Sequence, residues 1–279
     1  MLLSAWTTKL CATMSWKQKT QENKWTAVNA CISALGDRNL DEYKGADFLE
    51  LRQSLKGKSD FTIGSYMTNL KTIFGLAAQY DSVSSNPLAK IRVPVCRVDL
   101  DGRRHISEAE VKRVMAAAPR GLPMLIALCF YAGLRRGEAL RLEWPDVCLK
   151  ENWLRVRHQG TATTKGRTRR ARLELPLRKL LTLHRQTKGL VCSNLPSRLT
   201  DSLNNACFGA GVSHKEFTYQ RLRSSRSTIW SVDNELPDTV LNAMLGNSAM
   251  VRQRHYNTPL KEIFTEPLKH ADTTERIKP

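Results

Sequence analysis

Hydrophobic residues along the first 90 positions recur at the spacing of amphipathic helices. The pattern predicts a helix over Trp16 to Leu35, stopped by Gly36, and a shorter helix over Asp47 to Leu55, stopped by Gly57. From Phe61 to Tyr80 the apolar positions form one predicted buried stripe, which consists of Ile63, Tyr66, Met67, Leu70, Ile73, Phe74 and Ala77. We therefore expect a small helical domain over residues 1–91.

The pattern changes between residues 92 and 104. This segment has no helical period and contains Pro94 and Gly102, which predicts an extended linker. A second domain, residues 105–279, then begins with Ser107 and Glu110. These two residues have the spacing of a capping box, so a helix should start at residue 108.

The second domain continues with a nearly uninterrupted apolar stretch. Residues 122–132 predict a buried helix that Gly133 terminates, and another helix should run from about Arg136 to Leu142. Residues 153–158 and 170–175 alternate apolar and charged positions around a segment rich in Gly and Thr, which predicts a β-hairpin. The predicted fold class is mainly α, with a small antiparallel β-hairpin or sheet in the second domain.

Further helices are expected near the C-terminus. They resume from about Leu177, and residues 237–245 predict a helix stopped by Gly246. Ser248 is the predicted cap of a last helix that carries Tyr256, and a polar tail follows from about residue 258.

Charge is the strongest feature of the composition. The 279 residues contain 44 Lys and Arg but 26 Asp and Glu, which gives a formal net charge of +18. Such a surplus attracts a polyanion, so nucleic acid is the expected partner; a merely solvated basic surface is the alternative. The length suffices for two domains, each with its own core.

Other features limit the possible function classes. The seven cysteines form no C-x-x-C pair, which favours reduced thiols over a zinc site or a disulfide framework. No apolar run approaches the roughly 18 residues of a membrane span, and the start lacks the basic front of a secretory signal. We expect a cytoplasmic, nucleoid-associated protein. No phosphate-binding glycine loop is present, so no nucleotide cofactor is expected.

Three residues suggest chemistry on a DNA phosphate. Attack on a phosphodiester adds negative charge to its oxygens, and Arg135 with Arg223 could stabilise that charge. Tyr256 could be the nucleophile. Its free pKa of about 10 requires a neighbour to take the proton, and the leaving oxygen requires a general acid.

The first motif, AGLRRGEALRLEWPDV at residues 132–147, resembles the first signature box of the tyrosine recombinase (phage integrase) family. The resemblance implies that Arg135 is the first clamp arginine and that Glu138 supports it. The hairpin lysine of the family, the general acid, falls on Lys165.

The second and third boxes follow in order. Gln220 and Arg223 correspond to the second box, and Asn247 with Tyr256 to the third. The helix before Asn86-Pro87-Leu88 also resembles the helical core-binding domain of the family, so the resemblance covers roughly residues 5–260.

The resemblance implies a two-domain fold, in which a helical core-binding domain and an α+β catalytic domain close around duplex DNA. It implies strand cleavage and rejoining through a 3′-phosphotyrosyl intermediate, with four protomers on two DNA sites. No metal, cofactor, small-molecule substrate or membrane is implied, and the source is expected to be bacterial or phage-encoded. Further arginines are expected to contact DNA, namely Arg167, Arg169, Arg170, Arg221 and Arg226.

Two positions depart from the family pattern. Gln220 and Asn247 stand where the family usually has histidines, and neither titrates near neutral pH. Both could still donate hydrogen bonds to a phosphate, while His214 or His255 could compensate for the proton transfer. Two rival hypotheses stay open: a type IB topoisomerase-like enzyme that relaxes supercoils, and a catalytically impaired DNA-binding protein derived from a recombinase.

Overall fold

The computed structural model describes residues 1–93, 104–157, 168–232 and 237–246. The chain divides into two compact units, Met1–Arg97 and Val98–Pro279. Each unit has its own hydrophobic core.

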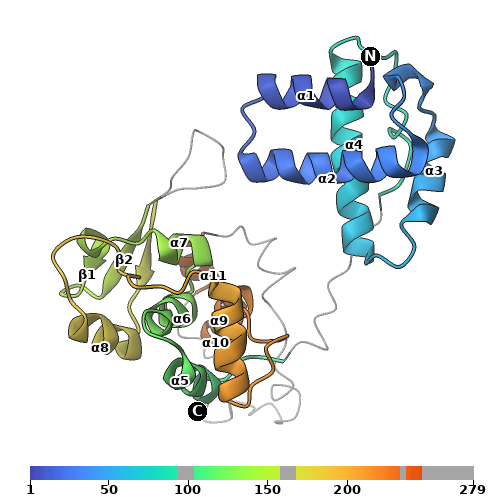
Figure 1. Ribbon diagram of the computed structural model, residues 1–279. Coiled ribbons are helices and arrows are strands. Elements are labelled where there is room, and N and C mark those ends of the chain that lie inside the picture. The colour runs from blue at the N-terminus through green and yellow to red at the C-terminus, as the bar shows by residue number, and fades with distance from the viewer. Residues whose placement is uncertain (94–103, 158–167, 233–236, 247–279) are drawn as a thin grey trace, which may run out of the picture. The chain divides into compact units, whose positions relative to one another are not determined.

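The first unit is helical in the part that the structure describes (Figure 1). Its elements are α1 (Leu3–Thr13), α2 (Gln18–Leu35), the 3-10 turn η1 (Leu40–Glu42), α3 (Gly45–Ser54) and α4 (Asp60–Gln79). The expected helices correspond to α2, α3 and α4, with ends that differ by one or two residues. Helix α1 was not predicted.

Helix α4 is the central element of the first unit. Ser59 caps it by accepting a hydrogen bond from the backbone N–H of Thr62 at 3.2 Å. The predicted stripe is buried, apart from Tyr66, which is half-buried. Phe74 in this stripe packs edge-on against Phe48 and Tyr43, each with ring centroids 5.4 Å apart, so α4 joins the remaining helices into one core.

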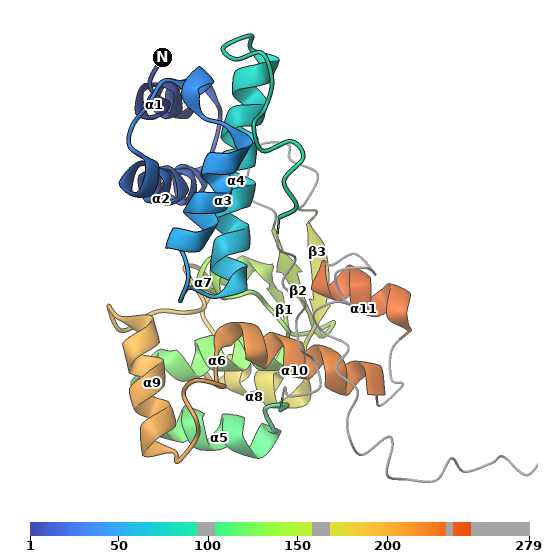
Figure 2. The same ribbon diagram turned by 90° about the vertical axis from the view of Figure 1, so that its right-hand side faces the viewer.

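The second unit combines helices with a small sheet (Figure 2). Its helices are α5 (Glu108–Ala117), α6 (Leu122–Tyr131), α7 (Arg136–Leu140), η2 (Trp144–Asp146), α8 (Leu175–Leu183), α9 (Leu199–Gly209), α10 (Tyr219–Val232) and α11 (Asp238–Leu245). Its strands are β1 (Val147–Cys148), β2 (Trp153–Val156) and β3 (Arg169–Arg172). The predicted fold class is confirmed.

The predicted start of α5 is also confirmed. Ser107 Oγ accepts from the backbone N–H of Glu110 at 3.3 Å, and Glu110 Oε2 accepts from the backbone N–H of Ser107 at 2.9 Å. Ile106 and Val111, on either side of this box, are both buried. The capping signal is local in sequence, so it could be recognised without knowledge of the fold.

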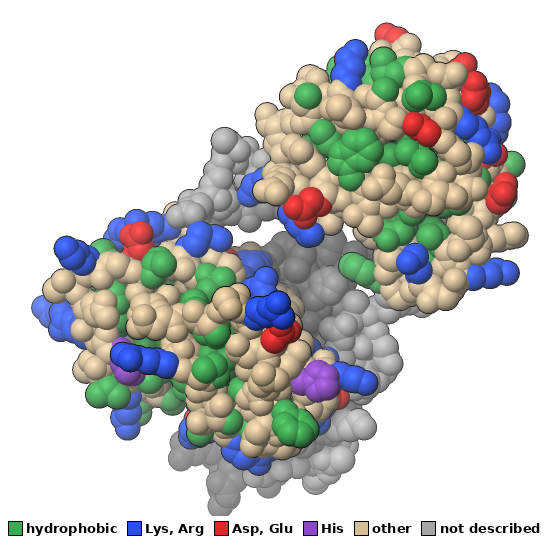
Figure 3. Space-filling view, viewed as in Figure 1, with side chains coloured by type: hydrophobic (Ala, Val, Ile, Leu, Met, Phe, Trp, Pro, Cys, Tyr) green, Lys and Arg blue, Asp and Glu red, His purple; other side chains and the backbone are tan. Residues whose placement is uncertain are grey.

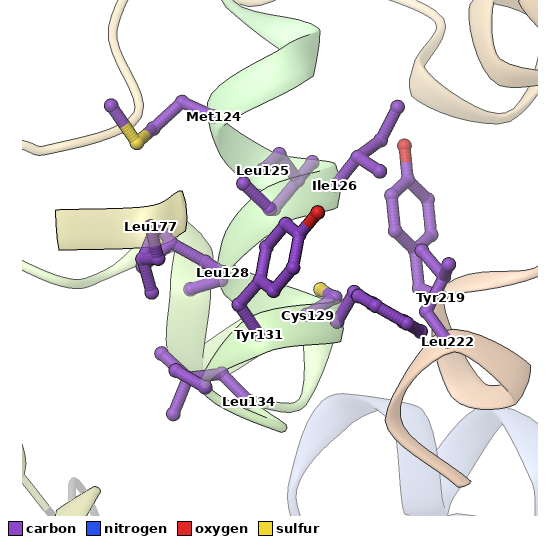
Figure 4. Close-up of a cluster of buried hydrophobic side chains, with 14 of the residues drawn as sticks. Met124, Leu125, Ile126, Leu128, Cys129, Tyr131, Leu134, Leu177, Tyr219 and Leu222 are labelled. Carbon is purple, nitrogen blue, oxygen red and sulfur yellow. The ribbon is translucent and has the colours of Figure 1, made fainter. Parts of the chain in front are cut away.

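Helix α6 forms the centre of the second core. All of its described side chains except Pro123 are buried. Figure 4 shows its side chains between Leu177 of α8 and Tyr219 and Leu222 of α10. Because α6 is covered on several sides, it is apolar around its whole circumference.

The strands form an antiparallel sheet in the order β1-β2-β3. Leu154 pairs with Ala171 and both are buried, whereas Arg155 pairs with Arg170 and both are exposed. The predicted hairpin is therefore confirmed, and β1 adds a strand that was not predicted.

The six cysteines that the structure describes are free. Burial raises the pKa of Cys31 and of Cys192 to about 12, and that of Cys207 to about 11. These thiols are therefore protonated at neutral pH, as expected for inert core cysteines.

Candidate functional site

The first box lies at the turn between α6 and α7. Gly133 has a φ of +60°, and a Cβ atom there would lie 2.9 Å from Leu245 Cδ2. Glycine is thus required both by the backbone conformation and by the close approach of α11. The turn leads into α7, where the backbone N–H of Arg135 donates to Glu138 Oε2 at 2.8 Å.

Glu138 gathers arginines from three separate elements. Arg169 of β3 binds it through two hydrogen bonds, Nη1 to Oε1 at 3.0 Å and Nη2 to Oε2 at 2.6 Å. Arg135 donates from Nη1 to Oε1 at 3.0 Å, and Nη1 of Arg223 lies 3.9 Å from Oε2. We call these four residues the Glu138 cluster.

The electrostatics of the cluster follow from this geometry. Burial by itself would raise the pKa of Glu138, whose side chain is 14% exposed. The hydrogen bonds and charge of Arg169, the backbone N–H of Arg135 and the charge of Arg223 overcome this effect and lower the pKa to about 2. The carboxylate is therefore ionised at neutral pH. One negative and three positive charges leave a surplus of positive charge.

The same arginines hold the C-terminal end of α11. Nε of Arg169 donates to the carbonyl of Met244 at 2.7 Å, and Nη2 of Arg223 to that of Leu245 at 2.5 Å. Nη2 of Arg135 reaches the carbonyl of Gly246 at 3.5 Å. The last carbonyls of a helix have no partner within it and form its negative end, which explains why cations gather there.

Arg223 is the most enclosed member of the cluster. Its side chain is fully buried, and besides Leu245 it donates to the carbonyl of Gly133. It therefore connects the first box to the end of α11, where the third box begins. The sequence did not predict that this guanidinium is bonded to two backbone carbonyls.

Three further described candidates lie on other parts of α10 and β3. Gln220 is exposed on the first turn of α10, one turn before Arg223. Arg221 donates from Nη2 to the carbonyl of Arg104 at 2.7 Å. Arg170 is exposed on the outer face of the sheet. The four candidates that lie outside the described residues are Lys165, Arg167, Asn247 and Tyr256.

Two arginines that we expected to contact DNA face the interior. Arg169 has a side chain that is 10% exposed and binds Glu138, as described above. Arg226 is also 10% exposed, and its Nη2 lies 2.9 Å from Glu174 Oε2. This placement differs from that of a surface phosphate contact, because each guanidinium already has a carboxylate partner within the fold.

The link between Arg169 and Glu138 was missed by the sequence reasoning, although a signal was present. Ala171 of β3 and Leu173 directly after the strand are apolar and buried, so the period of two places Arg169 on their side of the sheet. Arg170 and Arg172 fall on the other side. The alternation distinguishes these neighbouring arginines, whereas their shared charge does not.

In the part of the chain that the structure describes, no group of three or more His, Cys, Asp and Glu residues could hold a metal ion. None of the helices in that part has the length and apolar character needed to cross a membrane.

The fold is that of integrases solved on DNA. A lambda integrase dimer bound to a core site aligns with 96% of this chain and 100% of that one, with a TM-score of 0.76 and 18% identity. A lambda integrase tetramer bound to a Holliday junction has a TM-score of 0.70 at 18% identity, over 89% of this chain and 78% of that one. The Tn1549 transposon integrase with transposon end DNA has a TM-score of 0.69 at 16% identity, over 92% and 95% of the two chains.

Two curated proteins are similar to parts of the chain. A protein of Caldanaerobacter subterraneus subsp. tengcongensis named tyrosine recombinase XerC-like is 33% identical over 107 residues, which are 36% of this chain and 27% of that protein. The Escherichia coli (strain K12) protein IntQ, whose name describes a defective protein, is 26% identical over 156 residues, 50% of this chain and 39% of that protein. No protein-family model matches the chain. The resemblance to the tyrosine recombinase (phage integrase) family is confirmed, over less than half the length of each curated relative.

Proposed function

We propose that this chain is a site-specific DNA recombinase that cleaves and rejoins strands through a 3′-phosphotyrosyl intermediate. The observation that carries the proposal is the Glu138 cluster at the end of α11. Among the residues that the structure describes, the cluster holds three guanidiniums and one carboxylate, a surplus of two positive charges. A phosphodiester has one negative charge and gains more in the transition state, so the surplus has the sign and size that this reaction needs.

The proposed chemistry begins with Tyr256. The phenol gives its proton to water, its oxygen attacks the scissile phosphorus, the bond from phosphorus to the 5′ oxygen breaks, and Lys165 supplies the proton that this leaving oxygen takes up. The products are a 3′-phosphotyrosine, a free 5′-hydroxyl and a neutral Lys165. In the reverse step a 5′-hydroxyl of the partner strand gives its proton to Lys165 and attacks the phosphorus, and the tyrosine oxygen leaves and takes a proton from water.

The proposed roles of the two clamp arginines differ. Arg135 is partly exposed, with a side chain 43% accessible, and would contact the phosphate directly. Arg223 would exchange its bonds to the carbonyls of Gly133 and Leu245 for bonds to the phosphate. Glu138 and Arg169 would hold the clamp in place, and Gln220 and Asn247 would donate hydrogen bonds to phosphate oxygens.

The proposed partner is duplex DNA, and the proposed assembly is four protomers on two sites. The solved structures with this fold support both points, because they contain integrase dimers and tetramers on DNA. The net charge of +18 supports the same partner.

The test begins with duplexes selected from a random library for binding to the full chain. A nick beside the selected site then traps any covalent intermediate, because the short released strand diffuses away. We expect a protein–DNA adduct that resists denaturation and that disappears in Tyr256→Phe. Tyr80→Phe, at an exposed tyrosine of the first unit, is the matched control and should form the adduct normally.

An adduct that persists in Tyr256→Phe would refute the assigned nucleophile. Relaxation of supercoiled plasmid without exchange between two sites would favour the topoisomerase-like hypothesis. Tight binding to the selected duplex with no adduct would favour a second candidate, an impaired DNA-binding protein. The specific observation behind that candidate is that Gln220 and Asn247 stand where the family usually has histidines.

A further inference from the structure

The outer face of the sheet carries a basic surface that the proposed chemistry does not use. We call it the arginine face; its residues are Trp153, Arg155, Arg170 and Arg172. All three arginines are exposed, and Trp153 is half-buried. Figure 3 shows Lys and Arg side chains grouped over the part of the second unit that Figure 1 labels β1 and β2.

The register brings like charges together. Arg155 and Arg170 are directly opposite one another on β2 and β3. Side chains in such pairs have Cβ atoms about 5 Å apart, and like charges placed there are destabilising. Among the residues that the structure describes, neither has a carboxylate at ion-pair distance. Arg157, which directly follows β2, differs because it pairs with Asp146 at 2.8 Å and with Glu143 at 3.4 Å.

Trp153 organises this pair of arginines. The guanidinium of Arg170 lies 4.4 Å from the centre of the indole ring, and that of Arg155 lies 5.8 Å from it. The indole N–H donates to Glu151 at 2.7 Å, which fixes the ring at the edge of the face. A stacked guanidinium keeps the N–H donors along its rim available, so the face presents oriented donors at little further entropic cost.

The arginine face is separate from the Glu138 cluster. Successive side chains of a strand point to opposite sides of the sheet. Arg169 points toward Glu138 and the end of α11, and Arg170 therefore points away from them. A phosphate bound in the cluster cannot also contact Arg170 and Arg155 through the sheet.

The spacing of the face suits a nucleic acid backbone. Arg170 and Arg172 are two residues apart on one strand, a rise of about 6.7 Å. Duplex DNA carries one phosphate charge per about 1.7 Å of helix axis, so several phosphates fall within the length that separates these two arginines. Arginine also forms the bidentate contacts that phosphates favour.

We propose that the arginine face binds backbone phosphates of duplex DNA outside the cleavage pocket. This inference rests on DNA as the partner in the proposed function, but it does not require that the chain cleave DNA. It adds Arg155, Arg172 and Trp153 to the predicted contact Arg170 and gives a reason for the unfavourable cross-strand pair.

The test compares Arg155→Gln/Arg170→Gln with Arg113→Gln/Arg120→Gln. Both double variants remove two exposed positive charges from the second unit, but the control residues lie at α5 and the turn after it. Binding is measured over a range of salt concentrations, on a duplex limited to the selected site and on one with flanking DNA. We expect the log–log salt slope on the longer duplex to fall in magnitude by about 1.8 for the face variant, with at least ~10-fold weaker binding at 0.1 M salt. For the control variant, the decrease in slope should be less than half of the decrease expected for the face variant.

Two further readouts separate this proposal from a structural role and from the proposed function. The face variant should melt at the same temperature as wild type or higher, because a like-charge pair is removed. Its yield of covalent adduct per bound complex should match wild type. If wild type and both double variants form no adduct, the salt slopes still test whether the arginine face binds DNA.

Equal salt slopes for the face variant and the control would overturn the proposal. A lower melting temperature of the face variant would also count against it, because the arginines would then be structural. Loss of binding to polyglutamate without any change on DNA would assign the face to an acidic protein partner instead.

Discussion

Two carboxylates of the second unit hold arginines in different ways. Glu138 gathers three guanidiniums at the end of a helix, whereas Glu174 pairs with one arginine among the described residues, Arg226. Glu174 also accepts from the indole N–H of Trp230 at 2.9 Å, and the Arg226 guanidinium lies 5.4 Å from the ring centre of Phe130. We call Glu174 and Arg226 the Glu174 pair.

The comparison shows that burial alone does not mark a functional arginine. Arg223 and Arg226 are one turn apart on α10 and both are enclosed. The charges of the Glu174 pair cancel, and aromatic rings cover it, which suits a structural role. The Glu138 cluster keeps a surplus positive charge beside the negative end of α11. The net charge therefore distinguishes the Glu138 cluster from the Glu174 pair.

The largest expected effect concerns the stability role of the Glu174 pair. Arg226→Ala leaves Glu174 without its cation in a largely buried position, so we expect a loss of about 3–5 kcal/mol in the free energy of unfolding. Arg226→Met/Glu174→Gln removes both charges and keeps an acceptor for Trp230, so most of the loss should be recovered. Denaturant unfolding measures both variants. A double variant as unstable as Arg226→Ala would contradict the ion-pair explanation.

The next effect concerns the catalytic role of the Glu138 cluster. Arg223→Ala should slow adduct formation on the nicked duplex by on the order of 10²–10³, because a donor to the developing charge is lost. Binding to the same duplex should change much less. Gel-based adduct yields and binding titrations check this split. If binding and cleavage fell by the same factor, Arg223 would be a binding residue and the contrast with Arg226 would weaken.

A third prediction separates the neighbours Arg169 and Arg170. Arg169→Gln removes the bidentate partner of Glu138, so we expect about 1.5–3 kcal/mol less stability together with slower cleavage. Arg170→Gln changes an exposed side chain and should stay within about 0.5 kcal/mol of wild type. Thermal unfolding of the two variants provides the comparison. Equal destabilisation would mean that the period of two in β3 does not set their environments.

The last prediction concerns the pH dependence of the Glu138 cluster. The pKa of Glu138 in the folded protein is about 2, below its ordinary value of 4.5. The ionised carboxylate therefore stabilises the fold fully above pH 4.5, and this contribution is lost as the pH falls toward 2. We expect the difference in unfolding free energy between wild type and Glu138→Gln to shrink over that window. A constant difference from pH 6 to pH 2.5 would contradict the assigned ion pairs.

Local signals in the sequence predicted much of the fold. The apolar stripe of α4, the capping box at Ser107 and Glu110, and the apolar run of α6 each depend on residues within a few turns of one another. Helix α1 was missed although its buried residues Leu3, Trp6 and Leu10 have helical spacing, and β1 was missed because two residues are too few to show a period. Helix α1 contacts an element distant in sequence, because the indole N–H of Trp6 donates to the carbonyl of Ile73, whereas β1 pairs with the next strand, β2.

The sequence by itself determined the mainly helical class, the hairpin, the positive charge and the order of the motifs, because these depend on composition and on short-range periodicity. The tertiary structure alone decided which arginines meet. Arg135, Arg169 and Arg223 come from three elements and converge on the carbonyls of Met244, Leu245 and Gly246, up to 111 positions away. Such convergence depends on how whole elements pack, and no local pattern records it.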